Sequence, residues 1–178
     1  PFLHLLKKRE KSICFLTNNT SLSKDDHIKH LSEILPIDFA KKVYSPLDQV
    51  VKYLKRENIK KIFLLGTGSV MSFFSSKDFF LTEDDPEAVI VTFDTSLTYS
   101  KLVSASRILM TQNVKFILSN KDLRCPTEFG YIPDAGSIAK MIKTTTDHEI
   151  DYIFGKPSAD MLQTVLLDYG VTIDECVF

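Results

Sequence analysis

The stretch from Ala88 to Ser119, AVIVTFDTSLTYSKLVSASRILMTQNVKFILS, indicates the fold most clearly. Apolar, mostly β-branched and aromatic residues dominate 88–93 and 114–119, so each run predicts a buried strand. Residues 99–111 between them have the amphipathic pattern of a helix. Two strands joined by a helix form a βαβ unit, in which the strands are parallel. This stretch therefore predicts an α/β protein.

The same alternation continues on both sides of this unit, as expected for a mostly parallel sheet. It predicts further strands at 12–16, 61–65 and 152–154 and from Thr172, and further helices at 2–9, 23–35, 137–144 and 158–169 and from Pro46. The segments between them, including 74–86 and 120–136, are predicted to be loops because they are rich in turn-forming residues.

Short polar motifs mark where several helices begin and end. Ser23 with Asp26, and Ser45 with Asp48, have the spacing of capping boxes at helix N-termini. Gly170 is placed to end the last predicted helix in the usual left-handed conformation.

The composition is that of a globular protein. Of the 178 residues, 44% are hydrophobic and 25% are charged, which excludes a disordered or collagen-like chain. The 22 Lys and Arg residues are balanced by 23 Asp and Glu, so there is no basic excess for binding nucleic acid. No apolar run approaches the roughly 20 residues that span a bilayer. We therefore expect a cytoplasmic protein with no nucleic acid or membrane partner.

The cysteines and the chain ends add two expectations. Cys14, Cys125 and Cys176 are far apart in the sequence, so neither a disulfide framework nor a CxxC metal site is predicted. The chain begins with Pro1 and stops at Phe178 within an apolar run, and we expect it to be an internal portion of a longer protein.

The polar turn after the first predicted strand is the first candidate for chemistry. Thr17, Asn18 and Asn19 follow the apolar run 12–16 and precede a helix. Ligands of open α/β sheets bind at the carboxyl ends of strands, where hydroxyl, amide and backbone N–H donors suit a phosphate. The alternative is a simple Asx-type turn, with Thr20 or Ser21 as a helix cap.

A second candidate lies at the end of another predicted strand. Gly155 and Lys156 follow the apolar run 152–154 and precede Pro157 and Ser158. Lysine is a compact charge that can neutralise a phosphoryl oxygen, and glycine allows close approach of the backbone. The alternative is an ordinary solvated surface lysine.

Taken together, these segments resemble the haloacid dehalogenase-like phosphatases, in the subfamily of NagD and the pyridoxal phosphate and phosphoglycolate phosphatases. FLTNNTS at 15–21 is similar to the second motif of that subfamily, and FGKPS at 154–158 to the third. FDTSLTYSKL at 93–102 and LSNKDLRCPTEFGYIPDAGS at 118–137 are also subfamily-like. The resemblance covers nearly the whole chain, and four motifs in order are far more specific than one.

The resemblance implies a Rossmann-like core with an inserted α/β cap domain. Residues 1–43 and 151–178 would belong to the core, and residues 44–150 would form the cap that closes over the active site.

It also implies roles for individual residues. Thr17 matches the hydroxyl that binds the transferring phosphoryl group, with Asn18 and Asn19 adding backbone and amide donors. Lys156 matches the lysine that steadies the phosphoryl oxygens and the nucleophile.

Within the implied cap, Asp94, Asn120 and Asp122 match polar positions of the family, and the loop through Asp122 resembles its substrate-specificity loop. One departure is Asp134, which stands where the family often has glycine. It puts the local backbone conformation in question.

The family's nucleophilic and metal-binding carboxylates have no counterpart in the sequence. The family carries them in D-x-D-G and G-D-x-x-x-[ST]-D motifs, which would lie before and after these 178 residues. Family members form an aspartyl-phosphate and use Mg²⁺, so the resemblance implies a phosphoric monoester hydrolase with its Mg²⁺ ligands outside this chain. The chain alone would be inert. Its partner would be a small phosphorylated metabolite, and a homodimer is possible.

Two other functions remain open at this point. A relative without the carboxylates would bind phosphate esters, or dimerise, without catalysis. A dinucleotide-binding domain would use the loop 66–69, although that loop lacks the third glycine of the fingerprint.

Asp94 is not expected to be a nucleophile, because it follows the Thr17 turn and lacks a second Asp. His27, His30 and His148 are expected at the surface, and no residues are predicted to bind metal.

Overall fold

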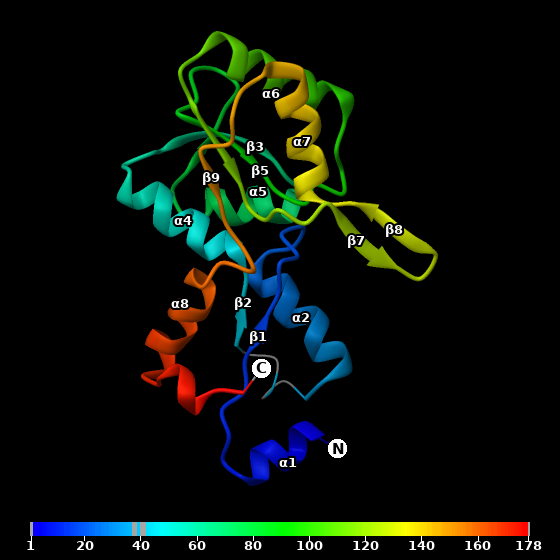
Figure 1. Cartoon of the computed structure of the whole chain (residues 1–178), viewed down its shortest axis with the longest axis vertical. Coiled ribbons are helices and arrows are strands. Elements are labelled where there is room, and N and C mark those ends of the chain that lie inside the picture. The colour runs from blue at the N-terminus through cyan, green and yellow to red at the C-terminus, as the bar shows by residue number, and fades with distance from the viewer. Residues whose placement is uncertain (1, 37–38, 40–41, 178) are drawn as a thin grey trace.

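The computed structural model describes residues 2–36, 39 and 42–177. It has two parts, one above the other in Figure 1. The large-sheet region, residues 46–153, contains a five-stranded sheet. The small-sheet region, formed by the described residues of 2–44 and 155–177, contains a two-stranded sheet. The predicted α/β class with parallel strands is confirmed.

The five strands of the large sheet are all parallel and are ordered β4-β3-β5-β6-β9. Their bounds are β3 Lys61–Leu65, β4 Phe80–Leu81, β5 Ala88–Val91, β6 Lys115–Leu118 and β9 Tyr152–Ile153. β9 pairs with β6, so its residues belong to this sheet, although the sequence analysis grouped them with the implied core.

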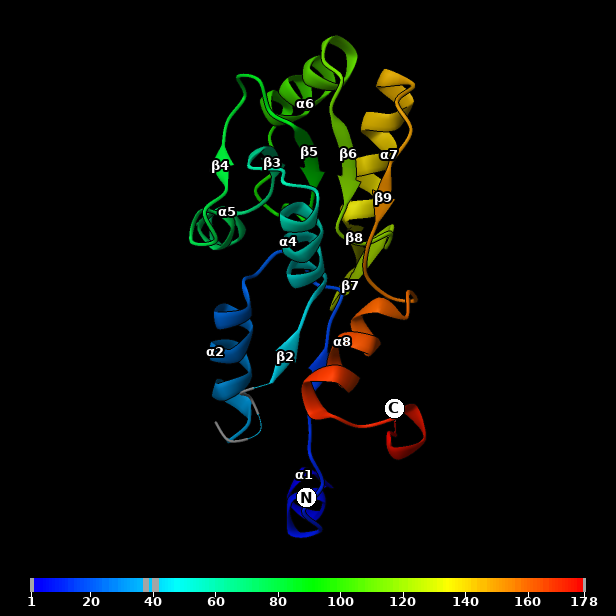
Figure 2. The same ribbon diagram turned by 90° about the vertical axis from the view of Figure 1, so that its left-hand side faces the viewer.

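Helices cover both faces of the large sheet. α4 (Pro46–Arg56) and α5 (Gly68–Ser75) lie on one face, and α6 (Tyr99–Thr111) and α7 (Ala135–Thr146) on the other, as Figure 2 shows. Side chains alternate along a strand, so Ile62 and Leu64 pack against α4 and α5, while Phe63 and Leu65 face α6 and α7. This two-sided burial explains why the strands are continuous apolar runs.

The small-sheet region is thinner. Its elements are α1 (Phe2–Lys8), β1 (Phe15–Leu16), α2 (Lys24–Ile34), β2 (Val43–Tyr44), α8 (Asp160–Tyr169) and the 3₁₀-helix η1 (Ile173–Glu175). Tyr44, Met161 and Val165 form its buried cluster.

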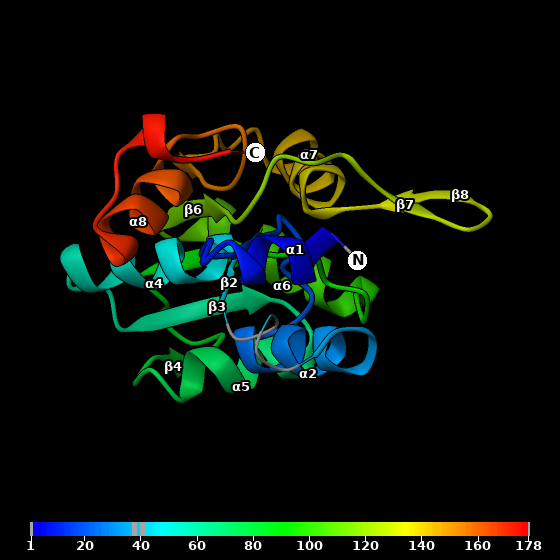
Figure 3. The same ribbon diagram turned by 90° about the horizontal axis from the view of Figure 1, so that it is seen from below.

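Some elements differ from the predictions. Residues 120–136, predicted as a loop, contain the antiparallel hairpin of β7 (Arg124–Thr127) and β8 (Gly130–Pro133), which projects from the molecule in Figure 3. Within the predicted loop 74–86, residues 74 and 75 belong to the end of α5, and residues 80 and 81 form β4. The strand predicted from Thr172 is wrong: Thr172 and Glu175 make a capping box that starts η1.

Two of the three predicted end motifs are confirmed, and two helices start at residues other than predicted: α7 at Ala135 instead of Ser137, and α8 at Asp160 instead of Ser158. Ser23 caps α2 by accepting the Asp26 N–H, and Gly170 ends α8 with a φ of 64°. Ser45 does precede α4, but its side chain makes no capping hydrogen bond, so the predicted box with Asp48 is wrong.

Candidate functional site

The polar turn after β1 lies against the carboxyl edge of the large sheet. Thr20 is fully buried there, and its hydroxyl oxygen accepts the Phe93 N–H at 3.0 Å, just beyond β5. The same hydroxyl lies 2.9 Å from Ser119 Oγ and accepts from Asn120 Nδ2 at 3.2 Å. Thr20 is therefore not a helix cap. It joins the two regions through a buried network that the sequence analysis missed.

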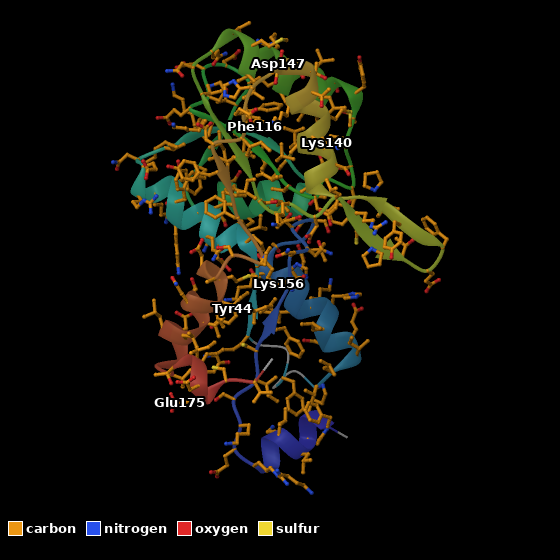
Figure 4. The ribbon with its side chains drawn as sticks, viewed as in Figure 1. Tyr44, Phe116, Lys140, Asp147, Lys156 and Glu175 are labelled. Atoms are coloured by element: carbon orange, nitrogen blue, oxygen red, sulfur yellow. The ribbon has the colours of Figure 1, made fainter. Side chains whose placement is uncertain are left out.

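Lys156 bonds to the turn that carries Thr17, at the junction of the two regions. The Lys156 ammonium donates to the Leu16 carbonyl oxygen at 3.3 Å, and its backbone N–H donates to Asn18 Oδ1 at 2.8 Å. Lys156 thus bonds to the residues on both sides of Thr17, although 138 residues separate it from Asn18. Figure 4 places Lys156 where the upper and lower parts of the molecule meet.

Asn19 forms an Asx-type turn, the structure given above as the alternative to a phosphate-binding turn. Its Oδ1 accepts from the Ser21 N–H at 2.9 Å and from the Ser21 hydroxyl at 2.7 Å, and its own N–H donates to Thr17 Oγ1. His27, expected at the surface, is buried, and its Nε2 lies 3.0 Å from the Asn19 carbonyl oxygen. Burial lowers the pKa of His27.

Asn120 and Asp122 bring the loop before the hairpin to the same place. Asn120 Nδ2 donates to the Asn18 carbonyl oxygen at 3.0 Å, and Asp122 Oδ2 accepts from Asn18 Nδ2 at 2.9 Å. Gly136 is needed here, because a Cβ atom on it would lie 2.5 Å from the Lys121 carbonyl oxygen.

Asp94 lies in a different set of contacts. Its carboxylate forms an ion pair with Lys101 at 2.6 Å and accepts from the N–H and hydroxyl of Ser96. Lys101 also donates to the Gly66 carbonyl oxygen. Within the described part of the chain, the structure brings Asp94 to these residues and not to the Thr17 and Lys156 cluster.

Asp134 keeps an ordinary backbone conformation, with φ −107° and ψ −176°. Its carboxylate accepts the Ala135 N–H at 2.5 Å and caps α7. Burial raises the pKa of this carboxyl group, and the charge of Asp122 acts in the same direction. The departure from glycine therefore replaces a flexible position with a helix cap.

The loop 66–69 is hydrogen-bonded to residues 21–26 of the chain itself. Thr67 caps α5, and its hydroxyl donates to the Ser21 carbonyl oxygen at 2.7 Å. Ser69 donates to the Asp26 carboxylate and accepts the Ser23 N–H. The strand order reverses beside β3, which is where doubly wound sheets bind ligands, and residues 21–26 of the chain itself occupy that position.

The described residues contain cavities but no cluster of metal ligands. No group of three or more His, Cys, Asp or Glu side chains among them could hold a metal ion. A cavity of about 350 Å³ lies beside Lys11, Lys42 and Tyr169, and one of about 300 Å³ lies at the amino edge of the large sheet beside Glu87 and Asp151. No described helix is long and apolar enough to cross a membrane.

Known proteins resemble this chain in sequence and in fold. The sequence model of the haloacid dehalogenase-like hydrolases matches residues 1–80. The 4-nitrophenylphosphatase of Schizosaccharomyces pombe is 27% identical in an alignment 194 positions long, gaps included, that covers 92% of this chain and 63% of the relative.

Solved structures agree with the sequence match. The 4-nitrophenylphosphatase of Thermotoga maritima has a TM-score of 0.87 at 32% identity, covering 96% of this chain and 66% of its own. A structure assigned to NagD has a TM-score of 0.86 at 32% identity, covering 96% of this chain and 68% of its own.

An α/β protein with polar turns meeting at strand ends, and with these likenesses, falls in the haloacid dehalogenase-like class. The chain belongs to that family of hydrolases, in its NagD-like branch. The chain spans 63% of the length of the yeast relative and 66% to 68% of the two solved proteins.

Proposed function

We propose that the protein hydrolyses small phosphomonoesters and that Thr17 and Lys156 hold the phosphoryl group. The names of its relatives support this substrate class: besides the 4-nitrophenylphosphatases, human glycerol-3-phosphate phosphatase is 32% identical over 96 residues, 53% of this chain. The observation that carries the proposal is the pair of hydrogen bonds from Lys156 to Leu16 and Asn18. They hold the Lys156 ammonium at the carbonyl oxygen of Leu16, the residue before Thr17.

The two side chains have complementary roles in this proposal. Thr17 Oγ1 already accepts the Asn19 N–H, which leaves its O–H to donate to a phosphoryl oxygen. The Lys156 ammonium supplies positive charge, and stabilising charge on the transferring group is the main contribution a protein makes to phosphoryl transfer. The Thr17 N–H donates to the Tyr44 carbonyl oxygen and the Asn19 N–H to Thr17 Oγ1, so the backbone N–H of Asn18 would be the further donor.

A Mg²⁺ requirement and an aspartyl-phosphate belong to the proposal only through the family resemblance. The described residues include no group of three or more His, Cys, Asp or Glu suited to a metal ion. By the same resemblance, its ligands are proposed to lie outside these 178 residues. Asn120, Asp122 and Asp94 are proposed as cap residues on the substrate side, with 44–150 as the cap. A cytoplasmic location and a homodimer are further parts of the proposal.

The test is the substitution Lys156→Ala in the intact protein, assayed with 4-nitrophenyl phosphate, glycerol 3-phosphate and a sugar phosphate. Loss of one charged stabilising group should lower kcat/KM by roughly 100- to 1000-fold, the size seen when a transition-state donor is removed. Lys140→Ala is the matched control, since Lys140 is an exposed lysine of α7 and lies far from Lys156 in Figure 4. Kinetics equal to the control would remove Lys156 from the mechanism.

The non-catalytic alternative gives a different result in the same experiment. An intact protein that binds inorganic phosphate through Lys156 but turns over no ester would be a phosphate-binding relative. Turnover that depends on Lys156 would exclude this alternative.

A further inference from the structure

The side chain of Asn18 has every hydrogen-bonding atom engaged within the protein. A primary amide offers two N–H donors and one carbonyl oxygen. Asn18 Nδ2 donates to Asp122 Oδ2 at 2.9 Å and to the Lys156 carbonyl oxygen at 3.2 Å, and Oδ1 accepts the Lys156 N–H at 2.8 Å. No N–H of this amide is left to bind a phosphate.

These bonds join three segments that are distant in the sequence: the turn after β1, the turn at Lys156 and the loop before the hairpin. Asn18 is 104 residues from Asp122 and 138 residues from Lys156. The same amide holds the Lys156 backbone at both its N–H and its carbonyl oxygen. Any rotation of the Asn18 side chain must therefore release or displace the backbone of Lys156.

Asp122 is held in turn by its own loop. Its N–H donates to Asn120 Oδ1 at 2.9 Å, and its carbonyl oxygen accepts the Gly136 N–H at 2.9 Å. The position of the Asp122 carboxylate thus depends on the loop at the base of the β7–β8 hairpin. When that loop is in place, Asp122 fixes the rotamer of the Asn18 amide.

Gly155 shows how closely these parts fit. Its φ is +82°, and a Cβ atom on it would lie 3.0 Å from Asn18 Oδ1 and 3.1 Å from Asn120 Cβ. The Lys156 turn can approach Asn18 only because residue 155 has no side chain.

We propose that Asn18 is a positioning residue that couples the hairpin loop to Lys156: contact with Asp122 holds the Asn18 amide, which holds the Lys156 backbone. Asn18 acts through Lys156, and its side chain does not bind phosphate. The catalytic consequence rests on the proposed function, whereas the coupling itself is a property of the folded protein. Loss of the Asp122 carboxylate should loosen Lys156 although these two residues share no hydrogen bond among the described contacts.

The test measures hydrogen exchange of the Lys156 amide in the intact protein by NMR. Asp122→Ala should raise its exchange rate roughly 3- to 10-fold, the change expected from weakening one hydrogen bond. Asp122→Asn should restore a rate near that of the wild type, since the asparagine Oδ1 can still accept from Asn18. The path through Asn18 is tested with Asn18→Ala. Its matched control is Asn113→Ala, because Asn113 is an exposed asparagine.

A double-mutant cycle tests the path. If Asp122 acts on Lys156 through Asn18, the double variant Asn18→Ala, Asp122→Ala should exchange no faster than Asn18→Ala alone. Additive effects on the exchange rate would overturn the proposal, as would an unchanged rate in Asp122→Ala. Binding of inorganic phosphate should weaken far less in Asn18→Ala than in Lys156→Ala. Equal losses of phosphate affinity would instead assign phosphate binding to the Asn18 amide.

Kinetics separate this proposal from the proposed function. If 4-nitrophenyl phosphate is hydrolysed, Asp122→Ala should lower kcat, and Asp122→Asn should recover it. If no ester is hydrolysed but exchange at Lys156 responds as described, the proposed function fails and the coupling stands. If Lys156→Ala abolishes hydrolysis but Asp122→Ala leaves the hydrogen-exchange rate of the Lys156 amide unchanged, the coupling fails and the proposed function stands.

Discussion

The large-sheet and small-sheet regions are held together in different ways. In the large sheet, all four residues of β5 are fully buried between two helical layers. In the small-sheet region, β1 and β2 have two residues each, and the buried cluster combines Tyr44 with Met161 and Val165 from the far end of the sequence. The large-sheet region is built from successive βα units. The small-sheet region depends on contacts between residues from the two ends of the sequence.

The largest expected effect comes from emptying the core of the large-sheet region. Phe116→Ala removes a fully buried ring between β6 and the α6 and α7 layer, and should lower the free energy of unfolding by about 3–5 kcal/mol. Met161→Ala, in the small-sheet cluster, should cost about 2 kcal/mol, because a thinner cluster can relax around the cavity.

Urea unfolding of both variants measures this difference. A cost for Met161→Ala equal to or larger than that of Phe116→Ala would show that the small-sheet region is as tightly packed as the large one. The distinction between the two regions would then be wrong.

A smaller effect is expected at the contact between the regions. Thr20→Val keeps the shape of a buried side chain but removes the hydroxyl that serves Phe93, Ser119 and Asn120. Leaving buried polar groups without a partner should cost about 1–3 kcal/mol. Thr145→Val is the control, because Thr145 is exposed on α7. Equal unfolding free energies for the two variants would show that the Thr20 network does not stabilise the junction.

The smallest effect concerns the pH dependence of stability. Burial raises the pKa of Asp134 in the folded state above its ordinary value near 3.8. At a pH between the pKa of Asp134 in the unfolded state and its pKa in the folded state, the folded protein binds more protons than the unfolded protein. Protonation of Asp134 therefore makes the free energy of unfolding fall as pH rises through this range. Asp134→Asn should remove that component while keeping an acceptor at the start of α7.

Urea midpoints measured from about pH 3.5 to about pH 6.5 give the comparison. The variant should gain stability relative to the wild type as pH rises through this window. A difference that stays constant with pH would show that Asp134 titrates normally in the folded protein.

Most elements of the large-sheet region could be predicted because their signals are local. The face of α4 formed by Leu47, Val50, Val51 and Leu54 is visible in the sequence and is buried as its spacing requires. The β7–β8 hairpin could not be predicted in this way. Its strands are short, β7 contains Pro126, and most residues of the two strands are exposed or half-buried, so they show no apolar pattern.

Local signals also misled at two places. The apolar residues near the chain end indicated a strand, but the Thr172 and Glu175 capping box starts a 3₁₀-helix. Residues 66–69 hinted at a nucleotide-binding loop, whereas Gly68 and Ser69 belong to α5, which Thr67 caps. In both cases a side-chain to backbone hydrogen bond over three residues outweighed the composition of the segment.

For the candidate site, the sequence by itself determined the residue types and their place at strand ends: Thr17 and Asn18 after β1, Lys156 after β9, Asn120 and Asp122 after β6. Only the tertiary structure decided what each side chain does. It separated Asp94 from the cluster, buried Thr20 and engaged the whole amide of Asn18. The physical reason is that strand and helix patterns repeat within a few residues, whereas the hydrogen bonds of Asn18 reach partners more than a hundred residues away.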